Sequence, residues 1–311
     1  MISTIFVKTE RKCYNTGKIH EGGLYMWEEK LAITGPYNFD LALSRLALDP
    51  LNAVDIEQRL VRVPLAFDDK KIIADVIATG TLEKPEFIVR ASDEKEKTLN
   101  RLTEIFQWDV ELLRVHEHFQ TTELKDLFND HFGTPLVLEF DPFSSLIKSI
   151  IHQQVNLKFA FTLTERFVKA FGEEVDGVWF YPSPDKVARL RVEQLREFQF
   201  SGRKAEYVIG IGELTAPGQL DFEKMKSMPD AEVSKELIKI RGVGPWTVEN
   251  FLMFALGRPN LFPMGDIGIQ NALKKYFELD DKPDLAQMEK YKEPWNPYLS
   301  YASLYLWRSI E

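Results

Sequence analysis

Residues 235–277 read KELIKIRGVGPWTVENFLMFALGRPNLFPMGDIGIQNALKKYF, and the rest of the chain is organised around this segment. Gly242 is expected to end a first helix, because glycine readily adopts the positive φ found at helix C-termini. Pro245 suits the first turn of a second helix, where its missing N–H has no partner to lose. An apolar face continues that helix to Gly257. The pattern predicts two helices joined by the hairpin Gly242-Val243-Gly244.

This hairpin also predicts a seat for an anion. A loop almost without side chains lets the backbone approach a partner closely, and the first N–H groups of the second helix carry the positive end of its dipole. Lys235, Lys239 and Arg241 flank the hairpin and are candidates for contact with phosphate. An ordinary turn between two helices is the alternative for Gly-Val-Gly taken alone.

Asp266 follows Gly244 by 22 positions and directly precedes a run with helical spacing, from Ile267 to Phe277. Its natural role there is to cap the N-terminus of a third helix. A capping pose also fixes the direction of the carboxylate, so the capping role and a catalytic role are compatible.

The composite of residues 240–247 (IRGVGPWT) and 262–266 (FPMGD) resembles the helix-hairpin-helix plus Gly/Pro-Asp signature of the DNA glycosylase superfamily. Within it, the chain looks like DNA-3-methyladenine glycosylase II, the alkylation-repair branch. The resemblance implies that Asp266 is the catalytic residue and that the hairpin binds the DNA backbone through Gly242, Val243, Gly244, Lys239 and Arg241. Relatives that cut the strand carry a lysine where this chain has Trp246, which implies a monofunctional enzyme.

The predicted fold class is α+β, with a small N-terminal α/β domain followed by a mostly helical core. Helical spacing marks residues 39–48 and 92–108, the latter with Ser92 as cap, and short apolar runs mark 58–66, 71–79 and 86–91. Everything after Val110 reads as helical. The predicted domains are 1–108, then 109–141 with 259–311, which holds the aspartate and the C-terminal aromatics, and 142–258, which holds the hairpin.

Composition limits the classes of function. The chain of 311 residues is 44% hydrophobic and 28% charged, as in ordinary globular proteins. Its one cysteine, Cys13, permits neither an intramolecular disulfide nor a four-cysteine iron–sulfur cluster. The net charge of −9 argues against a general nucleic-acid binder, although residues 141–260 hold 16 acidic and 16 basic residues. If the chain binds DNA, it is therefore expected to do so through one local face of its surface and through backbone N–H groups.

No signal peptide and no apolar run long enough to span a membrane is recognised, so a cytoplasmic protein is expected. One-site repair chemistry requires only a monomer. The first 30 or so residues match nothing that can be named.

Two helices are predicted around the polar junction 152–156 (HQQVN). The resemblance implies that one side chain of this junction acts as a wedge, which enters the duplex where the target base has been removed. The wedge would be Gln154 or its neighbour Gln153, at a position where members of the family commonly have leucine. A solvated helix junction is the alternative. Further on, Gly202 and the two cations that follow it either contact phosphate or begin a capped helix.

Large aromatics crowd the C-terminus from Trp295 to Trp307. Composition alone indicates a core helix. The resemblance implies that Trp307 lines a base pocket together with Trp246 and Tyr301. An indole face attracts a cationic alkylated base, and a fixed carboxylate stabilises the positive charge that develops on the sugar as the bond breaks.

No cofactor is expected for catalysis, since the 5 histidines are scattered and form no cluster with other ligand types. By resemblance, the backbone carbonyls of Ile238, Ile240 and Val243 would hold a monovalent cation that bridges to phosphate. Two alternatives remain open: a glycosylase for oxidised bases such as 8-oxoguanine, and a non-catalytic helix-hairpin-helix DNA-binding protein.

Overall fold

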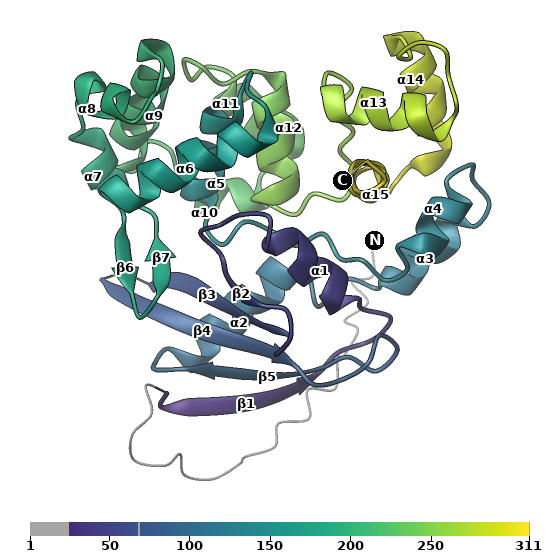
Figure 1. Cartoon of the computed structure of the whole chain (residues 1–311), viewed down its shortest axis with the longest axis horizontal. Coiled ribbons are helices and arrows are strands. Elements are labelled where there is room, and N and C mark those ends of the chain that lie inside the picture. The colour runs from purple at the N-terminus through teal and green to yellow at the C-terminus, as the bar shows by residue number, and fades with distance from the viewer. Residues whose placement is uncertain (1–24, 68, 311) are drawn as a thin grey trace, which may run out of the picture.

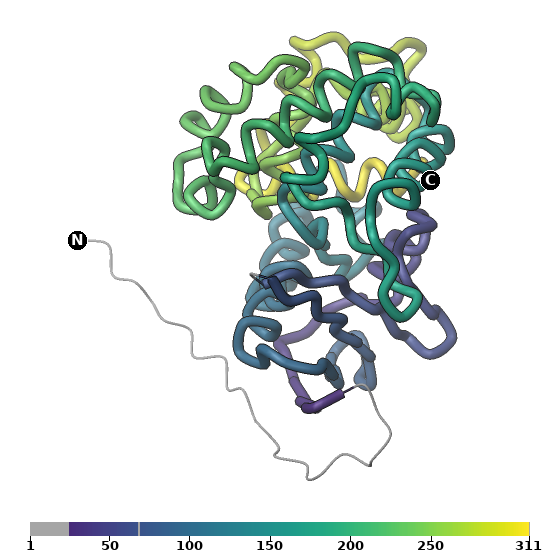
Figure 2. Tube along the Cα trace, turned by 90° about the vertical axis from the view of Figure 1, so that its left-hand side faces the viewer, coloured from purple at the N-terminus to yellow at the C-terminus, as the bar shows by residue number. Residues whose placement is uncertain are grey.

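The computed structural model describes residues 25–67 and 69–310, so the expectations for Cys13 and for most of the N-terminal segment lie outside it. Figure 1 shows a β-sheet at one end of the molecule and most of the helices at the other. In Figure 2, the purple and blue segments of the chain lie below the yellow-green ones. The predicted α+β class is confirmed. Within the described residues, none of the helices has the length and apolarity required to cross a membrane.

The sheet is antiparallel, with strand order β1-β5-β4-β3-β2. Its strands are β1 (Trp27–Ala32), β2 (Ala53–Asp55), β3 (Leu60–Phe67), β4 (Lys70–Ala78) and β5 (Glu86–Ala91). Alternate residues of β3 are buried, as expected for a sheet with one face on a core. Helices α1 (Phe39–Leu46) and α2 (Lys95–Phe106) contribute to that core, where Phe39 of α1 contacts Phe87 of β5 with ring centroids 5.2 Å apart.

The predicted serine cap of α2 was wrong. The helix begins three residues after Ser92, and its N-cap is Glu94, which has φ +49° and makes no side-chain capping bond. Asp93 and Glu94 instead contact the sheet, where the Lys70 ammonium donates to Asp93 at 2.6 Å and to Glu94 at 3.1 Å. The acidic pair therefore belongs to a tertiary contact with the sheet and does not form a helical first turn.

Two hydrophobic clusters divide the molecule. The first joins the sheet to α3 (Leu112–Phe119), α4 (Lys125–Asp130), α13 (Ile267–Tyr276), α14 (Leu285–Lys292), the 3₁₀ turn Glu293–Trp295 and α15 (Leu299–Arg308). The second is formed mainly by α5 (Pro142–His152), α6 (Leu157–Phe171), α7 (Pro184–Ala188), α8 (Val192–Glu197), α9 (Gly202–Thr215), α10 (Phe222–Ser227), α11 (Asp230–Leu237) and α12 (Pro245–Phe254). The three-domain division stays a prediction.

The expectation that everything after Val110 is helical was wrong at one place. Strands β6 (Glu173–Val175) and β7 (Val178–Phe180) form a hairpin that contacts β3. Its turn residues, Asp176 and Gly177, have φ of +47° and +76°, the conformation for which Asp-Gly is favoured in two-residue hairpins. An ion pair of Lys71 with Glu173 fastens the hairpin to the sheet.

The helix-hairpin-helix forms, but its first helix is shorter than expected, because α11 ends at Leu237 and turns lead from there to Gly242. After α11, Gly242 has φ +92°, and a Cβ there would lie 2.3 Å from the ring of Tyr207. Pro245 then begins α12, and the Asp266 side chain caps α13. Both requirements at Gly242, the backbone conformation and the close ring, demand glycine.

Candidate active site

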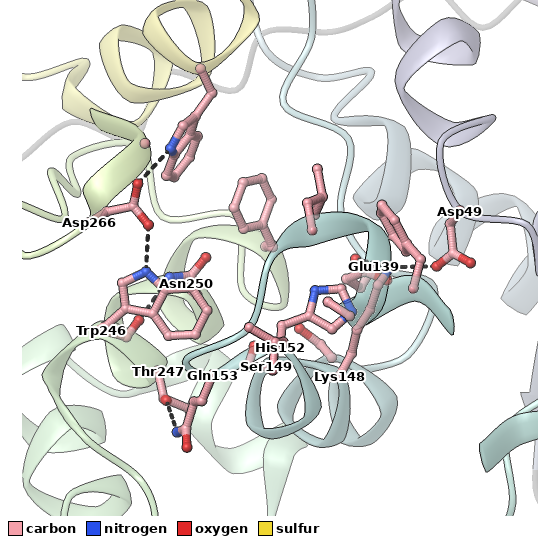
Figure 3. A pocket seen from close by; sticks show the side chains of 18 of the residues that line it. Asp49, Glu139, Lys148, Ser149, His152, Gln153, Trp246, Thr247, Asn250 and Asp266 are labelled. Atoms are coloured by element: carbon pink, nitrogen blue, oxygen red, sulfur yellow. Dashed lines mark hydrogen bonds and ion pairs between the residues drawn. The ribbon is translucent and has the colours of Figure 1, made fainter. Parts of the chain in front are cut away.

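A cavity of about 1570 Å³ lies where the two hydrophobic clusters meet. The segments that line it come from the end of α1, the link 134–140, α5, α6, α9, the hairpin, α12, α13 and α15 (Figure 3). It brings together most of the residues singled out from the sequence, namely Asp266, Trp246, Trp307, Gln153, Gln154 and the hairpin 242–244.

The Asp266 carboxylate is held by three N–H groups. Its Oδ2 accepts from Trp246 Nε1 at 2.7 Å (Figure 3). Its Oδ1 accepts from Trp307 Nε1 at 2.9 Å and from the backbone N–H of Ile269 at 2.9 Å. The capping bond fixes the direction of the carboxylate, and the two indole bonds fix the rings against it. The acid and the two aromatic walls therefore form one unit, built from α12, α13 and α15.

Gly268 permits this unit, and the sequence reading did not single it out. A Cβ at this position would lie 2.8 Å from Asp266 Oδ1 and 3.0 Å from the Trp307 ring. Any side chain would therefore separate the indole from the carboxylate. In the sequence, Gly268 is recognisable only as a glycine two residues after the aspartate. That spacing does not indicate that the glycine makes room for the Trp307 ring.

Tyr301 was expected in the base pocket, and the structure places it elsewhere. It is 2% exposed, packs in the first hydrophobic cluster and is absent from the cavity lining. Trp307 follows it by six residues on α15, which at 100° per residue turns the two side chains to different faces of the helix. Burial raises the pKa of the Tyr301 phenol, as expected for a core position.

Gln153 does not behave as a wedge. Its Nε2 donates to the carbonyl of Gly242 and to Thr247 Oγ1, both at 2.8 Å, so the side chain is bound to the hairpin and to α12. Its neighbour Gln154 is exposed and has φ +57°. Of the two glutamines, only Gln154 has a side chain free to enter DNA, and that role stays a prediction.

Lys204 also has an internal partner. Its ammonium donates to the carbonyls of Ile151 at 2.6 Å and Gln153 at 3.0 Å, and burial lowers its pKa. Ser201 caps α9. The capped helix start is thus observed, and Lys204 serves the end of α5. Contact of the exposed Arg203 with phosphate stays a prediction.

The far wall of the cavity holds a buried ionic cluster that the sequence did not predict. Lys148 pairs with Asp49 at 2.7 Å and Glu139 at 2.8 Å. Burial alone would lower the pKa of Lys148, but the two carboxylates raise it further than burial lowers it. Burial, aided by Lys148, lowers the pKa of His152 to about 3, so its imidazole is neutral at physiological pH. The partners lie far apart in sequence, so no local pattern reveals them.

Within residues 25–67 and 69–310, no group of three or more His, Cys, Asp or Glu side chains could hold a metal ion.

Residues 147–297 match the family model described as HhH-GPD superfamily base excision DNA repair protein. The putative DNA-3-methyladenine glycosylase YfjP of Bacillus subtilis is 53% identical over 287 residues, covering 92% of this chain and 100% of that protein. The DNA-3-methyladenine glycosylase of the same organism is 30% identical, covering 82% and 88%. The solved structure of the 3-methyladenine DNA-glycosylase from Archaeoglobus fulgidus has a TM-score of 0.80 at 23% identity, covering 91% and 97%; it shows a shared fold.

Glu249, on α12, supplies a test of the electrostatics around Asp266. Burial raises its pKa from 4.5 to about 7; Lys292 opposes this shift and the Asp266 carboxylate adds to it. Because the folded state holds this proton more tightly than the unfolded state, the associated stability is complete below pH 4.5 and is lost as the pH rises to about 7. Glu249→Gln should therefore melt roughly 2 to 6 °C above wild type at pH 8, with the difference vanishing near pH 4.5.

Thermal melts between pH 4.5 and 8.5 measure this difference. Glu213→Gln, at an exposed position of α9, is the control and should give no pH-dependent difference. A Glu249→Gln curve that runs parallel to wild type over the whole range would contradict the raised pKa.

Proposed function

The chain belongs to the HhH-GPD superfamily of base excision DNA repair proteins, and from this premise we propose that it is a monofunctional DNA N-glycosylase for alkylated purines. Its substrates are bases of the N3-methyladenine and N7-methylguanine type in duplex DNA, its product is an abasic site, and it acts as a monomer. The observation that supports this most directly is the Asp266 carboxylate, held by Trp246 and Trp307 on the wall of a large cavity.

Recognition begins with a base turned out of the stack, at a cost of a few kcal/mol. Alkylation on a ring nitrogen makes the base cationic, and the face of an indole attracts a cation by roughly 1 to 2 kcal/mol. Trp246 and Trp307 line the cavity beside Phe254, whose ring centroid lies 5.9 Å from that of Trp307. Aromatic faces select for charge and planarity, so several damaged bases fit.

Excision then depends on Asp266. A cationic base is already a good leaving group, so no strong general acid is required. As the glycosidic bond breaks, positive charge develops on the deoxyribose, and a fixed carboxylate stabilises it and orients the attacking water. Trp246 carries no amine for a Schiff base with the sugar, so the reaction ends at the abasic site without strand cleavage.

The DNA backbone is bound by the hairpin 242–244, with Lys239 and Arg241 beside it. Arg241 is three-quarters exposed, pairs with Glu206 at 2.8 Å and lies over the Tyr207 ring at 5.7 Å. An exposed pair of this kind exchanges readily for a phosphate. Gln154, exposed at the α5–α6 junction, fills the gap that the flipped base leaves.

The first test is excision from methylated duplex DNA. Asp266→Asn should lower the single-turnover rate of base release by roughly 100- to 1000-fold, because the charge opposite the sugar is lost, while affinity for an abasic duplex is retained. Asp281→Asn, at an exposed position, is the control with expected wild-type rates.

Equal rates for Asp266→Asn and wild type would remove the aspartate from the mechanism. Release of 8-oxoguanine but of no alkylated base by wild type would favour the oxidised-base alternative. Binding without release from any damaged duplex would favour the non-catalytic one.

The second test concerns the hairpin. A Cβ at Gly244 meets no atom within 4 Å, and φ −108° suits any residue, so Gly244→Val should fold normally. The added side chain keeps phosphate away from the amides, and affinity for abasic DNA should fall roughly tenfold. Gly210→Val, another glycine with open space at its Cβ, is the control. Unchanged affinity of the Gly244 variant in fluorescence anisotropy titrations would refute this use of the hairpin.

A third test concerns the cation. The carbonyls of Ile238, Ile240 and Val243 are hard oxygen ligands in the hairpin turn, and the Ile240 oxygen, which accepts the Val243 N–H at 3.0 Å, keeps a second lone pair. A monovalent cation held there supplies positive charge next to a phosphate. Affinity for abasic DNA should therefore be several-fold higher in potassium or sodium chloride than in tetramethylammonium chloride at equal ionic strength. Identical affinities in the three salts would exclude the cation.

A further inference from the structure

Asn250 presents a fixed hydrogen-bond acceptor to the cavity. It lies on α12 one turn after Trp246 and lines the cavity. Its Nδ2 donates to the Trp246 carbonyl at 2.8 Å. Because a carbonyl only accepts, this bond determines which end of the amide is nitrogen, and Oδ1 must take the opposite side. Figure 3 shows the amide oxygen of Asn250 directed away from Trp246.

The neighbouring polar groups are already engaged by the protein. The Asp266 oxygens accept three N–H groups, and Thr247 Oγ1 accepts from Gln153, whose amide also serves the hairpin. The cavity lining around the acid also contains the apolar residues Pro245, Phe254 and Ile267 and the two indole rings. Among the described residues on this wall, Asn250 Oδ1 is a neutral acceptor that no protein group occupies.

We propose that Asn250 determines specificity by accepting a hydrogen bond from an N–H on the edge of the flipped base. This inference rests on the proposed function and names a substrate feature: the exocyclic amine of an alkylated adenine or guanine. The ring charge of such a base makes the amine a stronger donor, so the bond is charge-assisted. A base whose amine is closed into a ring, such as 1,N6-ethenoadenine, offers no donor to Oδ1.

The bond acts on binding and not on the chemical step. The base is cationic while attached to the sugar and becomes neutral as it leaves, so the acceptor holds the bound substrate at least as strongly as the transition state. An interaction of this kind lowers the half-saturating concentration without raising the maximal rate. Asn250 is thus a recognition residue, distinct in its kinetic effect from Asp266.

The experiment uses Asn250→Leu, which keeps the side-chain volume and removes the acceptor. In single-turnover reactions on N3-methyladenine duplex, the half-saturating enzyme concentration should rise about tenfold, with the maximal rate within about twofold of wild type. Affinity for 1,N6-ethenoadenine duplex, measured by competition whether or not the base is excised, should change by less than about twofold.

Asn100→Leu, at an exposed position of α2, is the matched control and should equal wild type on both duplexes. Asn250→Ala gives the same readout should the leucine variant fail to fold. Equal weakening on the two duplexes, no weakening on either, or a fall confined to the maximal rate would overturn the inference. Absence of base release by wild type overturns the proposed function instead, because the competition titrations remain measurable.

Discussion

The site depends on one carboxylate with three N–H partners. Asp266 begins α13, yet it also binds the indole nitrogens of Trp246 on α12 and Trp307 on α15. Helices from both hydrophobic clusters therefore meet at two oxygen atoms. The partners are neutral N–H groups, two on indole rings and one on the backbone of Ile269, so they orient the carboxylate without supplying a counter-charge. In the proposed reaction, the negative charge of the acid is thus directed at the sugar without a competing cation. The absence of a side chain at Gly268 allows the Trp307 ring to approach the carboxylate this closely.

A second network fixes the features proposed to face DNA. Lys204 binds the last carbonyls of α5, and Gln153, at the end of that helix, binds the hairpin through Gly242 and α12 through Thr247. The exposed Gln154 and the hairpin amides are consequently tied to the same frame. A duplex held at the hairpin would meet the junction at a set distance, so the proposed phosphate binding and base displacement would be coupled by geometry.

Features of the fold and the site that depend on residues close in sequence could be predicted, and those that depend on residues far apart in sequence could not. The turn at Gly242, the first-turn proline and the Asp266 cap are local, because each is set by residues within one helical turn, and all three were predicted correctly. Tyr301 and Gln153 were misplaced because their environment is decided by tertiary packing, which the spacing of residues cannot reveal. The Asp-Gly turn between β6 and β7 is a local signal for a hairpin. The two strands have only three residues each, which is too short for an alternating pattern to be recognised in the sequence.

The charge distribution bears on how a chain of net charge −9 could bind a polyanion. Several of its cations are already engaged: Lys148 is neutralised by Asp49 and Glu139, and Lys204 serves backbone carbonyls. Contact with phosphate then rests mainly on neutral amides at the hairpin and on a few exposed side chains. Amides release no counterions, so binding by the proposed residues would be weak on undamaged duplex and would depend little on the salt concentration. In the proposed function, the binding energy is concentrated at the flipped base, where aromatic faces and the Asn250 acceptor would meet a cation. Such an arrangement suits a search through mostly intact DNA.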